Sequence, residues 1–144
     1  MASDTTTTVA NTTTSTPSLR TDRVRLAVLM APKPGLSFKE FDRYWLDVHA
    51  NVFSSIAIVK QNLLKYEQFH LDPKYEAVIN ASSLAKSKSP FRGIAIFEAT
   101  SLDKIFEIFQ DEEYLRVVVP DELNFFDHEK AQILAGPFAS IIDL

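Results

Sequence analysis

The feature that most constrains the fold is the order of two hydrophobic patterns along the chain. Short apolar or alternating runs, which are typical of strands, occupy residues 24–30, 63–71, 91–99 and 133–144. Helical patterns follow the first and the third of these runs. The order strand, helix, strand, insert, strand, helix, strand predicts two split βαβ units. Such units form a ferredoxin-like α+β domain with a four-stranded antiparallel sheet.

The first helix has the clearest start and the clearest apolar face. The segment Ser37-Phe38-Lys39-Glu40 has the pattern of a capping box, in which the serine hydroxyl and the glutamate carboxylate bind the first amides of the helix. The apolar residues in this segment are spaced by three, four, three and four positions: Phe38, Phe41, Trp45, Val48 and Val52. This spacing predicts one helix face buried against the sheet.

The remaining elements are marked by residues that cap or interrupt them. An Asp-Pro pair at positions 72–73 is typical of a helix start and predicts a short helix in the insert. Ser101 or Thr100 caps the next long helix, which we expect to end at Pro120. Gly93 in the third strand permits another group to approach the backbone closely.

Both long helices are expected on the same face of the sheet, which leaves the opposite face without cover. Strands this apolar cannot leave a whole sheet face in water. Pairing of two sheet faces about a two-fold axis is the simplest remedy. The sequence therefore predicts a homodimer through the sheet faces, which would be a dimeric α/β barrel.

Composition and charge limit the partners and the location of the protein. Residues 1–22 are rich in threonine and serine, so we expect a disordered tail before a folded domain at 23–144. The net charge of -4 and the scattered basic residues argue against nucleic acid and against an anionic membrane surface. No apolar run approaches the length of a membrane span. Because the first residues have no basic and apolar leader pattern, the expected location is cytoplasmic.

Several motifs resemble the EthD-like family. The first-helix pattern of that family is matched by Pro-Gly-Leu-Ser at 34–37, Glu-Phe at 40–41, Tyr-Trp at 44–45 and Val-His-Ala at 48–50. A fungal branch associated with polyketide clusters is similar at Tyr114 and at residues 66–70, 93–98 and 119–122. The resemblance extends over about residues 25 to 143.

The resemblance implies a small dimeric enzyme that needs no cofactor. The fungal branch includes decarboxylases and dehydratases of aromatic polyketides, so we expect a lyase that tailors an aromatic polyketide in secondary metabolite biosynthesis. More distant relatives include anthrone monooxygenases, polyketide cyclases and accessory proteins of ether degradation. Fold does not determine the reaction, so two alternatives stay open: a cofactor-free anthrone-type monooxygenase and a non-catalytic dimeric protein that binds a ligand.

The chain has three histidines, the natural acid–base groups near neutral pH. His49 is on the flank of the first helix face, and the family resemblance makes it the primary acid or base; the alternative is a half-buried structural histidine. His70 shares a strand face with Tyr66 and Gln68. We assign His70 as the counterpart of His49, with Tyr66 and Gln68 orienting a substrate carbonyl; the alternative places His70 in solvent. His128 is in a charged turn and is expected on the surface.

Aromatic and acidic residues complete the expected substrate site. Trp45 and Phe106 are expected to sandwich the rings of the substrate, and Tyr44 and Tyr114 to close the pocket. The alternative is that these aromatic residues belong to the core. Asp121 is included in the substrate site, where it would orient a histidine. Its alternative role is to favour a helix N-terminus electrostatically.

The sequence predicts no metal, nucleotide or flavin site. Cysteine is absent, and the histidines are not at the spacings that hold a metal. The three glycines form no phosphate-binding loop, and no Gly-x-Ser-x-Gly motif marks a serine nucleophile.

Overall fold

A computed structural model describes residues 16–85 and 88–144. Its sheet contains the strands β1 (Val24–Met30), β2 (Lys65–His70), β3 (Gly93–Ala99) and β4 (Gln132–Gly136). Their order across the sheet is β2-β3-β1-β4, and all neighbours are antiparallel. The predicted ferredoxin-like α+β fold is confirmed. Most of the predicted N-terminal tail, residues 1–15, lies outside the described residues.

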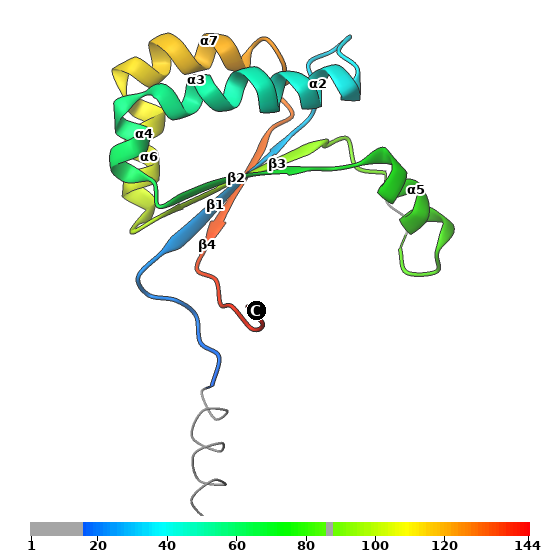
Figure 1. Cartoon of the computed structure of the whole chain (residues 1–144), viewed down its shortest axis with the longest axis horizontal. Coiled ribbons are helices and arrows are strands. Elements are labelled where there is room, and N and C mark those ends of the chain that lie inside the picture. Colours follow the sequence, from blue (N-terminus) through cyan, green and yellow to red (C-terminus); the bar gives the residue numbers. More distant parts are fainter. Residues whose placement is uncertain (1–15, 86–87) are drawn as a thin grey trace, which may run out of the picture.

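The helices form a layer on one side of this sheet (Figure 1). The first helical rod consists of α2 (Phe38–Tyr44), a π-helical turn η1 (Trp45–His49) and α3 (Ala50–Ser55), and α4 (Ala57–Asn62) follows it. The second group consists of α6 (Leu102–Gln110), a second π-helical turn η2 (Tyr114–Val118) and α7 (Val119–Glu122). The helix of the insert, α5 (Pro73–Ala81), projects beyond one end of the sheet (Figure 1).

Local capping explains where the helices begin. The capping box of Ser37 and Glu40 is present at the start of α2. The side chain of Ser101, rather than that of Thr100, caps α6. Pro120 does not end the second helical group, because it lies in the first turn of α7, where a missing N–H is tolerated.

The buried face of the first rod differs from the predicted one. Phe41, Trp45, His49 and Phe53 are buried, whereas Phe38 is exposed. These four residues are spaced by four positions each, and an α-helix with 3.6 residues per turn would rotate such a series away from the sheet. The wider turn of η1 compensates for this rotation. His49 is therefore on the buried face and not on its flank.

The last strand is shorter than predicted. It ends at Gly136 because Pro137 has no N–H to continue the ladder. The following segment continues beside the residues that precede β1: Arg20 N–H donates to the carbonyl of Phe138 at 2.8 Å, and the Arg25 guanidinium lies 3.8 Å from the Phe138 ring centre.

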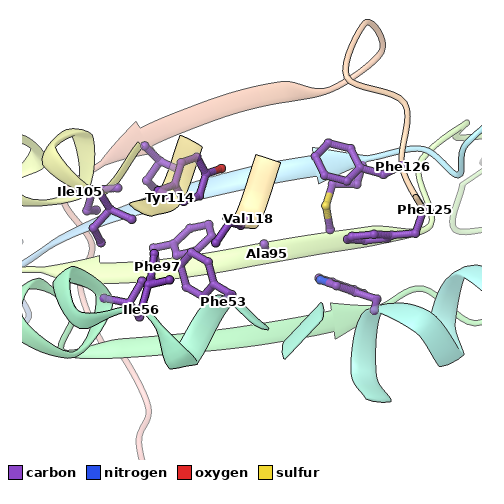
Figure 2. Close-up of a cluster of buried hydrophobic side chains, with 14 of the residues drawn as sticks. Phe53, Ile56, Ala95, Phe97, Ile105, Tyr114, Val118, Phe125 and Phe126 are labelled. Atoms are coloured by element: carbon purple, nitrogen blue, oxygen red, sulfur yellow. The ribbon is translucent and has the colours of Figure 1, made fainter. Parts of the chain in front are cut away.

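The core lies between the helices and the sheet (Figure 2). Phe97 of β3 packs against Phe53 of α3 at 5.5 Å between ring centres and against Phe109 of α6 at 5.9 Å. At the other end, Phe125 and Phe126 pack against each other at 5.2 Å. The core therefore has two aromatic groups, one at each end of the sheet.

At Gly93 the first rod approaches the sheet closely. A Cβ at this position would lie 2.6 Å from Cζ3 of Trp45 and 3.2 Å from Cε1 of Phe41. Both rings are fully buried and have little room to move. The close approach that the sequence predicted is confirmed.

The substitution Gly93→Ala should therefore lower the free energy of unfolding by about 1–3 kcal/mol, because it overpacks the contact with Trp45. Urea denaturation followed by the fluorescence of Trp45 measures this change. Gly136→Ala is the matched control, since a Cβ at Gly136 meets no atom within 4 Å. Equal stability of the two variants would contradict the packing described.

On the opposite face of the sheet, no helix of the described residues lies over the strands (Figure 1). Alternation along the strands places six apolar side chains there: Ala27, Leu29, Phe69, Ile94, Ile96 and Leu134. Glu98 is on the same face and is buried beneath Arg25 and Arg23, whose guanidinium groups donate to its carboxylate at 2.7 and 3.1 Å. We refer to these six apolar residues as the open face.

Candidate active site

A cavity of about 300 Å³ lies between the sheet and the helix layer. This volume is at the small end of the range for sites that bind small molecules. Its walls are mostly aromatic, with rings from both helical groups and from the sheet: Trp45, Phe53, Tyr66, Phe97, Phe109 and Phe126. Four polar side chains also line it: His49, Tyr114, Glu122 and His128.

His49 enters the cavity from the first rod and is held by Asp121 of α7. Its Nδ1 lies 2.8 Å from Oδ2 of Asp121, and the residue is only 5% exposed. A carboxylate accepts hydrogen bonds, so Nδ1 carries the proton and Nε2 keeps a free lone pair. Burial lowers the pKa of His49, although Asp121 opposes this effect. The imidazole is therefore neutral at pH 7 and able to accept a proton.

Asp121 is held in position by Tyr44, and Tyr44 is held in turn by Asn124. The Tyr44 hydroxyl donates to Oδ1 of Asp121 at 2.5 Å, and the Asn124 amide donates to the Tyr44 oxygen at 2.9 Å. Burial and the neighbouring Asp121 raise the pKa of Tyr44, so the phenol stays protonated as a donor. The sequence suggested that Tyr44 closes the pocket, but Tyr44 does not line the cavity. Its hydroxyl is used by Asp121, and its ring stacks on Phe125 at 5.4 Å.

Glu122, the next residue on α7, forms a second polar group in the cavity. The buried Tyr114 hydroxyl donates to its Oε2, and its Oε1 lies 3.0 Å from Nε2 of His128. Burial raises the pKa of Glu122, while Tyr114 and His128 act in the opposite direction. Burial and the neighbouring Glu122 also raise the pKa of Tyr114.

His70 does not reach the cavity, which corrects the predicted pairing with His49. Both ring nitrogens have partners, since Nδ1 lies 3.1 Å from Oδ1 of Asp42 and Nε2 lies 2.8 Å from Oε1 of Gln68. The His70 ring lies 4.5 Å from the Trp45 ring, and Trp45 lines the cavity. His70 instead lines an open groove between the first rod and the β2 strand, which we refer to as the outer groove.

The predicted polar row on β2 exists, but only part of it is in the cavity. Tyr66 lines the cavity, whereas Gln68 lines the outer groove with His70. The Gln68 amide donates to the Trp45 carbonyl at 3.0 Å and to the Tyr66 hydroxyl at 3.1 Å. Gln68 therefore positions Tyr66 and Trp45 and does not contact the cavity.

The predicted sandwich of Trp45 and Phe106 is wrong. Phe106 is 43% exposed on the outer side of α6, and Phe109 of the same helix lines the cavity instead. Tyr114 does line it. The sequence analysis did not place Glu122 among the site residues, and it placed His128 on the surface. The one available signal was the adjacent acidic pair at the end of the second helical group.

Among residues 16–85 and 88–144, no group of three or more histidine, aspartate or glutamate side chains is arranged to hold a metal ion. In the same part of the chain, no helix has the length and apolar character needed to cross a membrane.

Comparison with known proteins gives one family and several similar folds. The model of the EthD domain matches residues 33–129. A search of curated proteins gave no significant match. A bacterial structure, an ethyl tert-butyl ether D family protein from Bacillus halodurans, is similar with a TM-score of 0.53 and 15% identity, over 79% of this chain and 96% of that one. A dimeric ferredoxin-like protein of unknown function from Bacteroides fragilis is similar with a TM-score of 0.51 and 13% identity, over 84% of this chain and 100% of that one. A hydroxynitrile lyase from Passiflora edulis is also similar, with a TM-score of 0.57 and 16% identity, over 86% of this chain and 100% of that one. At these identities the likeness shows the fold alone.

Proposed function

Since the chain belongs to the EthD domain family, we propose that it is a cofactor-independent lyase that acts on a small aromatic molecule of the polyketide type in secondary metabolite biosynthesis. The observation that carries this proposal is the His49–Asp121 pair at the wall of an aromatic cavity. A neutral, oriented imidazole in an apolar site is the arrangement that proton abstraction requires.

His49 is the base in this proposal. Its Nε2 takes a proton from the carbon next to a carbonyl, and Asp121 stabilises the imidazolium that results. The substrate's own carbonyl groups delocalise the negative charge that develops, so the step needs no cofactor. The aromatic walls exclude water and bind a flat ring system through stacking and edge contacts.

Other reactions are known on this fold, and fold alone does not select among them. The Passiflora edulis neighbour is named as a lyase, which is compatible with the proposal.

The test is to incubate the purified protein, without oxygen or any added cofactor, with two aromatic probes: a β-hydroxy ketone and a hydroxyaryl carboxylic acid. A lyase releases water or carbon dioxide, which liquid chromatography with mass spectrometry detects. Conversion that requires oxygen would instead indicate a monooxygenase. Quenching of the single tryptophan, Trp45, without any conversion would indicate a ligand-binding protein, because Trp45 lines the cavity.

The open face supports the further proposal that two copies of the chain form a homodimer. Its apolar side chains come from all four strands, and the helices that the structure describes lie over the other side (Figure 1). An uncovered apolar face of this extent is typical of an interface. Pairing of two such faces would complete a dimeric α/β barrel.

Ile96 lies near the centre of the open face, on one of the two inner strands. Ile96→Lys should convert the dimer into a monomer, because it places an unpaired charge in the interface. Analytical ultracentrifugation measures the mass in solution. Leu115→Lys, at an exposed position of η2, is the control and should leave the dimer intact. A monomeric wild-type protein would contradict the proposal.

A further inference from the structure

Tyr114, Glu122 and His128 form a hydrogen-bonded chain at the cavity that the proposed base does not use. Tyr114 is buried, the Glu122 side chain is 13% exposed, and the His128 side chain is 37% exposed. The three groups are linked in that order through the two oxygens of Glu122. This series of hydrogen bonds therefore leads from the interior of the cavity to solvent.

The surroundings of Glu122 favour its neutral, protonated form. Its carboxyl group lies among aromatic walls, and no lysine or arginine is among the described residues that line the cavity. The titratable groups that face it are two phenols, two imidazoles and one carboxylate: Tyr66, Tyr114, His49, His128 and Asp121. None of these is a permanent cation, so a carboxylate at Glu122 would be desolvated without a fixed counter-charge.

His128 gives this acid a connection to solvent. At 3.0 Å, Nε2 of His128 and Oε1 of Glu122 can share one proton, which is bound either by the carboxyl or by the imidazole. The His128 ring packs on Phe126 at 4.7 Å, which holds it over the cavity wall. An imidazole in this position exchanges protons between bulk water and Glu122.

We propose that Glu122 is the general acid of this cavity, that it protonates the departing oxygen of a neutral β-hydroxy ketone, and that His128 returns a proton to it from solvent. The inference rests on the proposed function, in which His49 is the base. Asp121 and Glu122 are adjacent on α7. One helix turn would thus fix both the base, through Asp121, and the acid.

The reaction balances as a dehydration. The bond between hydrogen and the carbon next to the carbonyl breaks, and Nε2 of His49 takes the proton. The bond between the β-carbon and its oxygen breaks, Glu122 gives its proton to that oxygen, and water leaves as a carbon–carbon double bond forms. Nothing is oxidised or reduced. Afterwards His49 loses its proton and Glu122 regains one through His128.

The charges of the site also favour a neutral substrate over a carboxylic acid. A substrate carboxylate in this cavity would be desolvated close to Glu122 and near Asp121, without a lysine or arginine among the described lining residues. Burial of an unpaired charge is costly. Loss of water from a hydroxy ketone is thus favoured over loss of carbon dioxide from an acid.

The test uses E122Q, with E129Q as its control. Glutamine can keep both hydrogen bonds of Glu122 but cannot donate a proton, whereas Glu129 is exposed in the turn beyond the cavity. With the β-hydroxy ketone probe, E122Q should lower kcat by about 10²-fold, and E129Q should leave it unchanged. H128A should lower kcat, and added imidazole should restore it. The wild type should convert the hydroxy ketone faster than the carboxylic acid.

An infrared measurement that needs no substrate tests the same proposal. The wild type at pH 7 should show the carbonyl band of a protonated carboxyl group, and E122Q should lack it. Absence of this band in the wild type, or wild-type kcat in E122Q, would overturn the role of Glu122 even if His49 is the base. Faster conversion of the acid probe would overturn the substrate class. Conversion of neither probe, with the band present, would instead count against the proposed function.

Discussion

Replacing His49 with glutamine should lower kcat for the β-hydroxy ketone probe by about 10²–10⁴-fold, the usual contribution of one positioned acid or base. Glutamine can keep a hydrogen bond to Asp121 and fills a similar volume, so the change mainly removes the basic Nε2. Steady-state kinetics under anaerobic conditions measure the effect. A circular dichroism spectrum like that of the wild type would show that the fold is retained.

His70→Gln is the matched control for this variant. Both ring nitrogens of His70 are used outside the cavity by Asp42 and Gln68, so we expect kcat to change little. A loss of activity in His70→Gln equal to that in His49→Gln would contradict the site described. Full activity of His49→Gln would remove His49 as the base.

The pH dependence of kcat/KM should follow the protonation of His49 in the free enzyme. Burial lowers its pKa below the ordinary value of 6.5, and the base is active only when it is neutral. Activity should therefore rise with pH through a midpoint below 6.5 and stay on a plateau until Glu122, the proposed acid, loses its proton at higher pH. Asp121 raises the pKa of His49, so Asp121→Asn should move this rising limb to lower pH. The plateau should also fall, since asparagine no longer stabilises the imidazolium.

The order of the elements was predictable because each strand and each helix start has a local cause. The β-branched run of β1, the capping box before α2 and the close approach at Gly93 depend on neighbouring residues or on the absence of one side chain. An open sheet face also follows directly from having two helical segments on one side. These features need no knowledge of distant contacts.

The composition of the site was less predictable because both helical groups contain a π-helical turn. In each group the inward-facing residues are spaced by four: Phe41, Trp45, His49 and Phe53 in the first, and Tyr114, Val118 and Glu122 in the second. A periodicity of 3.6 residues rotates His49 toward the flank, and the expected end at Pro120 leaves Glu122 out of the helix. Turns of this kind are frequent at functional sites, and local sequence does not reveal them.

The assignment of His70 failed for a different reason. The strand alternation correctly placed Tyr66, Gln68 and His70 on one face of the sheet, which is the helix side in the structure. Alternation says nothing about what lies between side chains on one face. The Trp45 ring, which approaches Gly93, lies beside His70 and leaves it in the outer groove. A side chain from one helix thus divides what the sequence presented as a single polar row.

Phe125→Ala should lower the free energy of unfolding by about 3–5 kcal/mol, the usual cost of truncating a buried phenylalanine to alanine. Phe125 is fully buried, and its ring packs against four others at 4.7 to 5.6 Å between centres: His49, Phe126, Tyr44 and Phe41. Chemical denaturation of the full chain measures the change. Phe125→Leu should cost less, because leucine leaves a smaller cavity.

The same substitution also tests whether the core supports the site. Phe125 lies against the His49 ring and stacks on Tyr44, which holds Asp121, so its removal loosens both sides of the His49–Asp121 pair. We therefore expect Phe125→Ala to lower kcat even under conditions in which the variant is fully folded. Phe106→Ala, at an exposed position of α6, should change neither stability nor kcat by a comparable amount. If Phe125→Ala lost stability but kept the wild-type kcat and pH profile, the tyrosine, aspartate and histidine would be held by their hydrogen bonds alone.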